Sequence, residues 1–171
     1  MSIFRILSVL LQYPQQELLD AVMDIRDMLK DIPLSTEHNA VLEKYLQRLE
    51  STQLTKLQEE YVQTFDLVPE HSLHLTHHLF GDERGRGPAL IDLAEYYKEY
   101  GLLADETELP DYLPLILEFS SELDETEANL FLSQTVKVLQ QLAVNLEKAD
   151  SPYAPLIRVV ESKGQLAPVA A

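Results

Sequence analysis

Apolar residues recur at helical spacing along most of this chain, and no other feature constrains its fold as strongly. One stripe advances in steps of four, three and four residues: Leu18, Val22, Ile25 and Leu29. Such steps place side chains on one face of a helix. Four more segments have stripes of this kind: 42–49, 57–65, 90–100 and 131–146. No segment alternates apolar and polar residues with the period of two expected for a half-buried strand. The sequence therefore predicts an all-α fold, built as a helical bundle.

Capping residues and the apolar stripes predict several helix boundaries. Ser35 has the short hydroxyl side chain preferred at an N-cap, and we expect Asp111 to cap the helix that follows it. Gly101 is expected to end the preceding helix, because glycine readily adopts positive φ. The stripes also predict one continuous helix over 15–30 and one long helix over 126–146.

The chain is long and apolar enough for one domain. It has 171 residues, of which 46% are hydrophobic, and this share is typical of a packed globule rather than a disordered acidic segment. We expect a single all-helical domain over 1–164 and a disordered tail over 165–171. The sequence leaves open whether the chain is a monomer or a homodimer.

The charge of the chain is strongly acidic. Thirteen basic residues stand against 29 acidic ones, which gives a formal net charge of −16. This charge repels nucleic acid and anionic lipid and attracts basic segments, so we expect no nucleic-acid partner. No Lys or Arg occurs between Lys98 and Lys137, an interval rich in Asp and Glu. The interval is either a solvated acidic face or a docking surface for a cationic partner.

The absence of cysteine and of a targeting pattern narrows the class further. Without cysteine, disulfides, thiolate metal sites and cysteine nucleophiles are excluded. The first residues lack the pattern of a secretory signal peptide. No apolar run approaches the ~20 residues that span a bilayer. We therefore expect a soluble, cytoplasmic protein without membrane insertion.

Two groups of residues could carry chemistry of their own. A cluster of four histidines has spacings of three and four: His71, His74, His77 and His78. On a helix, His74 and His78 would share a face, as metal ligands often do. The alternative is histidines that are partly buried, hydrogen-bonded or facing a partner peptide. The loop 81–87 has glycines and two arginines but no phosphate-loop pattern. The carboxylates within 108–118 have no nucleophile beside them, so we expect no enzymatic activity.

Two segments within 61–119 differ from ordinary amphipathic helix. The first reads YVQTFDLVPEHSLHLTHHLFGDERGRGPALIDLAEYY from residue 61, and the second reads ELPDYLPLILEF from residue 108. In their order and separation they resemble the nitrate reductase delta subunit family, the NarJ-type molybdenum-cofactor assembly chaperones. That family is grouped with the all-α redox-enzyme maturation chaperones. The chain departs from the family pattern at Tyr112, where histidine is usual, and a phenol does not titrate near neutral pH.

The resemblance implies a cytoplasmic chaperone dedicated to one client. Such a chaperone would bind the N-terminal segment of the catalytic subunit of a membrane-bound nitrate reductase. It would hold the apoenzyme for insertion of molybdenum cofactor and an iron–sulfur cluster, before membrane docking, without binding a cofactor stably itself. Two alternatives stay open: a chaperone for another molybdoenzyme, and a helical metal-binding accessory protein that uses the histidines.

A client segment with basic and apolar residues could bind as an amphipathic helix in a groove. Apolar contacts would supply most of the affinity, and carboxylates would speed encounter and set orientation. Protonation of His74 or His78 would make binding sensitive to pH. The residues expected to bind the peptide are Tyr61, Phe65, Asp66, His74, His78, Arg86, Glu108, Asp111, Tyr112 and Glu118.

Overall fold

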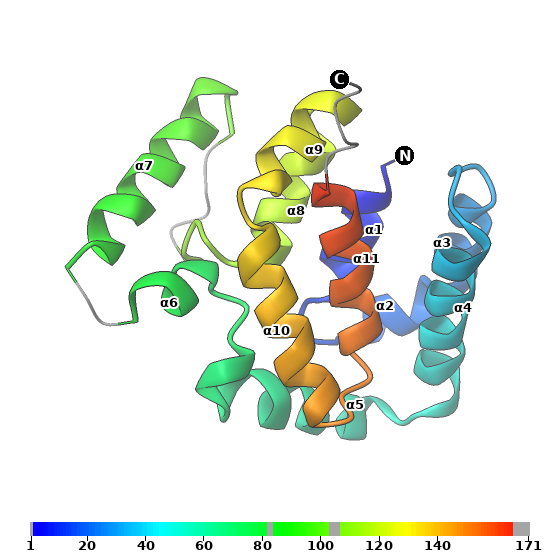
Figure 1. Ribbon diagram of the computed structural model, residues 1–171. Coiled ribbons are helices and arrows are strands. Elements are labelled where there is room, and N and C mark those ends of the chain that lie inside the picture. Colours follow the sequence, from blue (N-terminus) through cyan, green and yellow to red (C-terminus); the bar gives the residue numbers. More distant parts are fainter. Residues whose placement is uncertain (1, 82–83, 103–106, 166–171) are drawn as a thin grey trace.

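The computed structural model describes residues 2–81, 84–102 and 107–165, and these residues fold as helices (Figure 1). Within this part of the chain the only β-type pairing is one isolated bridge, between His74 and Tyr112. The predicted all-α fold is confirmed. Residues 166–171 of the predicted tail lie outside the described residues.

Five helices form the centre of the molecule (Figure 1): α1 (Ile3–Leu10), α8 (Leu113–Ser121), α9 (Glu125–Ser133), α10 (Val136–Lys148) and α11 (Ala154–Gly164). The closest packing joins α1 to α8 and α10 to α11. Their inward faces supply side chains with no exposed surface, among them Leu7, Leu10, Leu117, Leu142 and Ile157. Burial of such apolar side chains is the main force that holds the bundle together.

The chain between α1 and the middle segment forms a flank of three helices: α2 (Gln16–Asp20), α3 (Val22–Leu29) and α4 (Thr36–Ser51). Ser35 caps α4 as predicted, since its hydroxyl accepts a hydrogen bond from the His38 N–H at 3.1 Å. The continuous helix predicted over 15–30 is wrong, because the backbone turns at Ala21 (ψ −3°). The apolar stripe still works as expected, and all four of its members are buried.

The middle segment follows as α5 (Leu54–Tyr61), a π-helical turn (Val62–Asp66), a 3₁₀ turn (Pro69–His71), α6 (Leu75–Phe80) and α7 (Arg86–Glu99). Helix α7 stands beside the central bundle at the left of Figure 1 and buries one described residue fully, Tyr97. The Tyr97 hydroxyl donates a hydrogen bond to the Pro110 carbonyl at 2.6 Å. Gly101 ends this part of the chain with the predicted positive φ of 76°.

The long helix predicted over 126–146 is wrong, because the chain breaks it into α9 and α10. The Thr135 hydroxyl donates to the Leu132 carbonyl at 2.7 Å, and this local bond competes with the helical pattern. The break also serves packing. The end of α11 comes so close to it that a Cβ atom on Gly164 would lie 2.8 Å from the Leu132 oxygen.

We predict that Gly164→Ala lowers the free energy of unfolding by about 1–3 kcal/mol, the usual cost of overpacking. The added methyl would meet the Leu132 oxygen and the Val136 side chain, both at 2.8 Å. Gly87→Ala in α7 is the matched control, since its Cβ would meet nothing within 4 Å. That change should leave stability equal or raise it by about 0.4–1 kcal/mol. Urea unfolding followed by circular dichroism measures both, and equal effects would contradict the close approach of α11.

Candidate functional site

Residues from the two distinctive segments meet at one cavity of about 290 Å³, next to the side chain of Tyr13. Six of the ten residues expected to bind a peptide line it: Tyr61, Phe65, Asp66, His74, Glu108 and Tyr112. The remaining lining residues are Tyr13, Val62 and Leu73. The cavity therefore brings six of the ten expected residues together and leaves out His78, Arg86, Asp111 and Glu118.

The π-helical turn Val62–Asp66 forms one side of this cavity. It is closed by a hydrogen bond from the Leu67 N–H to the Val62 carbonyl at 3.2 Å. A π turn widens the helix by one residue and is frequent at functional sites. Here the turn lets Phe65, which is buried, and Asp66, which is exposed, both line the cavity. The apolar stripe predicted the burial of Phe65 but not the π turn.

A short antiparallel contact joins the two segments. The Leu113 N–H donates to the Leu73 carbonyl at 2.8 Å, and the Leu75 N–H donates to the Asp111 carbonyl at 3.2 Å. Between these bonds, the rings of His74 and Tyr112 stack with centroids 5.2 Å apart. The contact thus builds one wall of the cavity from residues of both segments.

The hydroxyl of Tyr61, a buried residue that lines the cavity, has two partners. The carbonyl oxygen of Leu11, 2.9 Å away, can only accept, so Tyr61 donates its proton there. The Tyr112 hydroxyl, 2.7 Å away, must then donate to Tyr61. Burial raises the pKa of both phenols, which stay protonated.

Aromatic packing fixes these rings from behind. The centroid of Phe65 lies 4.8 Å from that of Tyr61 and 4.8 Å from that of Tyr153, which belongs to the turn before α11. Tyr13 packs edge-on against Tyr61 at 5.8 Å. Such aromatic pairs contribute about 0.5–1.5 kcal/mol each beyond the area they bury. Tyr61 and Phe65 therefore line the cavity while packed against other aromatic rings.

Two exposed carboxylates, those of Asp66 and Glu108, stand at the opening of the cavity. No Lys or Arg is among the described residues that line it. The pKa of the Tyr112 phenol reflects this charge. Burial is the largest cause of its rise, and the negative charges of Glu108 and Asp66 raise it further. The opening is therefore electronegative.

Asp111 has a different position from the one predicted. It does not cap α8, whose preceding residue is Tyr112 and which has no side-chain cap. Its side chain is 1% exposed, and its Oδ2 accepts hydrogen bonds from the Thr76 N–H at 3.0 Å and the Thr76 hydroxyl at 2.5 Å. Arg86 donates to the same hydroxyl at 3.1 Å, and its guanidinium lies 4.0 Å from Asp111. Asp111 and Arg86 thus tie α6 and α7 to the chain before α8.

Glu118 and His78 lie outside the cavity. Glu118 pairs with Arg5 at 2.5 Å, on the contact between α8 and α1. The expectation that His74 and His78 share a helix face is wrong, because His74 precedes α6 in extended conformation. His78 lies within α6, and its Nε2 donates to the Ser72 carbonyl at 2.6 Å.

Comparison with known proteins assigns the chain to a family. Residues 32–158 match the family described as nitrate reductase delta subunit. The chain belongs to this family. It is 34% identical over 160 residues to the "Probable nitrate reductase molybdenum cofactor assembly chaperone NarJ" of Bacillus subtilis, covering 92% of this chain and 85% of that protein.

Two relatives from Escherichia coli (strain K12) extend the comparison. The "Nitrate reductase molybdenum cofactor assembly chaperone NarJ" is 34% identical over 158 residues, covering 88% of this chain and 64% of that protein. The "Probable nitrate reductase molybdenum cofactor assembly chaperone NarW" is 31% identical over 157 residues, covering 91% and 65%. All three names describe chaperones, not catalysts, in this nitrate reductase delta subunit family.

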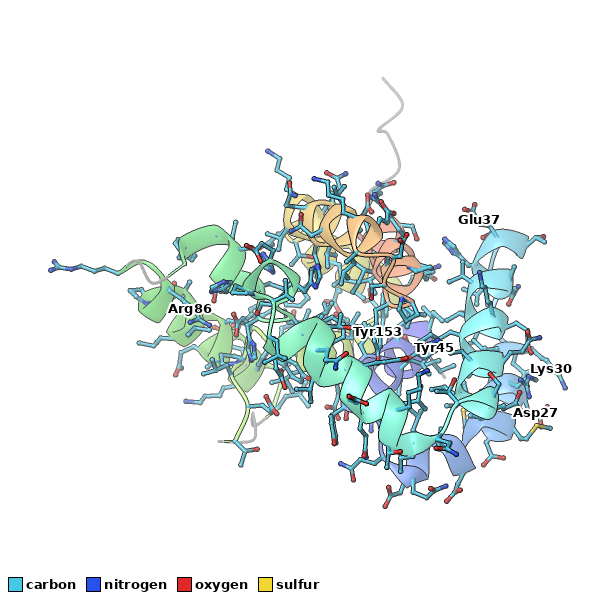
Figure 2. All side chains as sticks on the ribbon, turned by 90° about the horizontal axis from the view of Figure 1, so that it is seen from below. Asp27, Lys30, Glu37, Tyr45, Arg86 and Tyr153 are labelled. Atoms are coloured by element: carbon cyan, nitrogen blue, oxygen red, sulfur yellow. The ribbon has the colours of Figure 1, made fainter. Side chains whose placement is uncertain are left out.

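This family member also has a larger cleft that the sequence did not indicate. It lies between α4 and the segment leading into α11, with two continuous parts of about 1040 and 450 Å³. Tyr45 lines it and packs against Tyr153, and Glu37 lines it near the start of α4 (Figure 2). Its walls come from 37–52 and 147–165, segments that no motif links, so a reading along the chain had no signal for it.

Two other properties concern the described residues as a whole. They contain no group of three His, Asp or Glu side chains placed to hold a metal ion. None of their helices has both the length and the apolar character needed to cross a membrane.

We predict that Asp111→Ala lowers the free energy of unfolding by roughly 2–3 kcal/mol, because it leaves buried donors of Thr76 without an acceptor. Asp92→Ala, at an exposed position of α7, is the control and should change stability by less than about 0.5 kcal/mol. Thermal and urea unfolding of both variants provide the measurement. A loss for Asp111→Ala as small as that for Asp92→Ala would show that the buried network does not stabilise the fold.

Burial lowers the pKa of His78 from its usual 6.5, and the hydrogen bond to Ser72 offsets this in part. The unfolded chain therefore binds more protons at this residue than the folded protein does. It follows that stability is lost as the pH falls below about 6.5, towards the lowered pKa. We predict that His78→Gln, which keeps an N–H donor for Ser72, reduces this loss between pH 7 and pH 5. His38, whose pKa burial also lowers, contributes equally in both proteins. Identical pH profiles would exclude His78 as a source.

Proposed function

We propose that this protein is an assembly chaperone for a nitrate reductase and acts while the molybdenum cofactor is inserted into that enzyme. Membership of the nitrate reductase delta subunit family supports this role, as do relatives named as nitrate reductase molybdenum cofactor assembly chaperones. The chaperone has no catalytic part in nitrate reduction.

The chaperone binds the N-terminal segment of the catalytic subunit in the cytoplasm. It holds the apoenzyme until the molybdenum cofactor and an iron–sulfur cluster are in place, before membrane docking. One observation carries the choice of site: residues from both family segments converge on the cavity beside Tyr13.

The size of the cavity limits how the client binds. Its volume of about 290 Å³ is just below the range of ligand pockets, about 300–1,000 Å³, so a whole helix does not fit inside. The client segment therefore lies across the opening and inserts a side chain. The rigid aromatic rings lose little conformational freedom on binding, which favours affinity. The net charge of −16 speeds the approach of a basic segment.

We predict that a synthetic peptide copying the N-terminus of the nitrate reductase catalytic subunit from the same genome binds this protein with a negative heat-capacity change, because apolar surface is buried. A scrambled peptide of equal charge should bind at least about tenfold more weakly, a difference of ~1.4 kcal/mol. Isothermal titration calorimetry measures both.

Two tyrosine variants locate the site in the same titrations. Tyr13 lines the cavity and is 44% exposed, whereas Tyr100, the residue after α7, is 45% exposed and does not line it. Tyr13→Ala should weaken peptide binding about tenfold, as expected for an interface tyrosine, and Tyr100→Ala should leave it unchanged. Equal binding of true and scrambled peptides would reduce the interaction to nonspecific electrostatics. Equal loss in both variants would move the site away from the cavity.

A further inference from the structure

We propose that the cavity between the π turn and the His74–Tyr112 wall is a binding site for one cationic side chain, that of arginine or lysine. The inference deepens the proposed function, on which it rests for the identity of the chain that brings the cation. Three independent features of the cavity support it: its aromatic walls, its free carboxylates and the direction of its hydroxyl protons.

Five of the nine residues that line the cavity carry an aromatic ring: Tyr13, Tyr61, Phe65, His74 and Tyr112. The faces of tyrosine and phenylalanine rings attract a cation within about 6 Å of the ring centroid. Guanidinium groups in particular stack on such rings. The contacts of Phe65 and Tyr61 with Tyr153 hold the rings in place before any ligand arrives.

The two carboxylates at the opening lack a cation. Some other carboxylates are paired: Glu118 with Arg5, and Glu147 and Glu161 with Arg158. Among the described residues, Asp66 and Glu108 form no such ion pair. A cationic group that entered here could donate charge-assisted hydrogen bonds to these two carboxylates.

The hydroxyl groups of Tyr61 and Tyr112 favour a positively charged ligand over a negatively charged one. The Tyr61 hydroxyl donates its hydrogen bond to the Leu11 carbonyl, and the Tyr112 hydroxyl donates its own to the Tyr61 oxygen. Neither phenol has a proton left to donate, but the Tyr112 oxygen keeps a lone pair. These groups can accept a hydrogen bond from an ammonium or guanidinium and cannot donate one to an anion.

The larger cleft between α4 and α11 is a poorer candidate for the same role. Its walls carry three basic residues beside four acidic ones, whereas the described lining of the smaller cavity has no Lys or Arg to oppose a cation: Lys44, Arg48 and Arg158 against Glu37, Glu147, Asp150 and Glu161. It also exceeds 1000 Å³ and does not confine a single side chain. Charge and size together favour the smaller cavity.

The inference can be tested with small probes that do not depend on any client. Nα-acetyl-arginine amide and Nα-acetyl-lysine amide carry the cation, and Nα-acetyl-citrulline amide is a neutral match for the arginine probe in shape. Ring signals of Tyr61, Tyr112 and Phe65 in aromatic NMR spectra report occupancy of the cavity. We expect saturable shifts with a Kd on the order of 1 mM for arginine or lysine, and binding at least about tenfold weaker for citrulline.

Two double variants make the experiment specific. Asp66→Asn with Glu108→Gln removes both carboxylates at the opening and should abolish the preference for arginine over citrulline. Asp92→Asn with Glu122→Gln removes two exposed charges outside the cavity and should leave the preference unchanged. The inference is overturned if citrulline binds as well as arginine, if the first double variant keeps the preference, or if no ring signal of the cavity moves.

Client peptides separate this inference from the proposed function. Each Arg and Lys of the N-terminal client peptide is replaced singly by citrulline or methionine and titrated into wild-type protein and into the Asp66→Asn/Glu108→Gln variant. One position should lose about tenfold in affinity with wild type and almost nothing with the variant. If the peptide binds but no Arg or Lys position behaves in this way, the cation site is contradicted and the chaperone role is not. A cavity that prefers cations in a protein that ignores the client peptide supports the inference and sinks the proposed client.

Discussion

The candidate site depends on the short antiparallel contact between 73–75 and 111–113. Two backbone hydrogen bonds fix its register, so that His74 and Tyr112 must face each other. Tyr112 then reaches the Tyr61 hydroxyl, and Asp111 is carried inward to Thr76 at the start of α6. One contact thus closes the wall of the cavity on one side and anchors α6 and α7 on the other. The segments 73–75 and 111–113 therefore contribute both to the cavity and to the buried network of Asp111.

The parts of the structure that depend on local patterns were predictable from the sequence. The stripe of Leu18 to Leu29 is buried, Ser35 caps α4, and Gly101 has positive φ, because each follows from spacing or from the backbone preference of one residue. The family segments placed six expected residues in one cavity. Periodicity predicts Tyr61 and Phe65 as core residues, and both are buried; only the resemblance suggested a site beside them.

The parts that depend on distant partners were not predictable. Asp111 has the residue type of an N-cap for the helix that follows it. Its carboxylate instead accepts a hydrogen bond from the N–H of Thr76 in α6, which lies 35 residues earlier in the chain. The sequence suggested that Glu118 is a carboxylate available to a client, but in the structure it pairs with Arg5 of α1. The π turn and the cleft beside α4 arise from packing between segments. Neither has a signature in a window of residues along the chain.

The hydrogen bond between Tyr61 and Tyr112 spans 51 residues of sequence, and the support of Phe65 by Tyr153 spans still more. Contacts this distant form late, because the loop between them must close first. A ribosome releases the chain from its N-terminus, so the helices before residue 66 emerge with half of a cavity and nothing opposite it. The cavity is therefore incomplete until Tyr112 has been made, and its support from Tyr153 arrives later still.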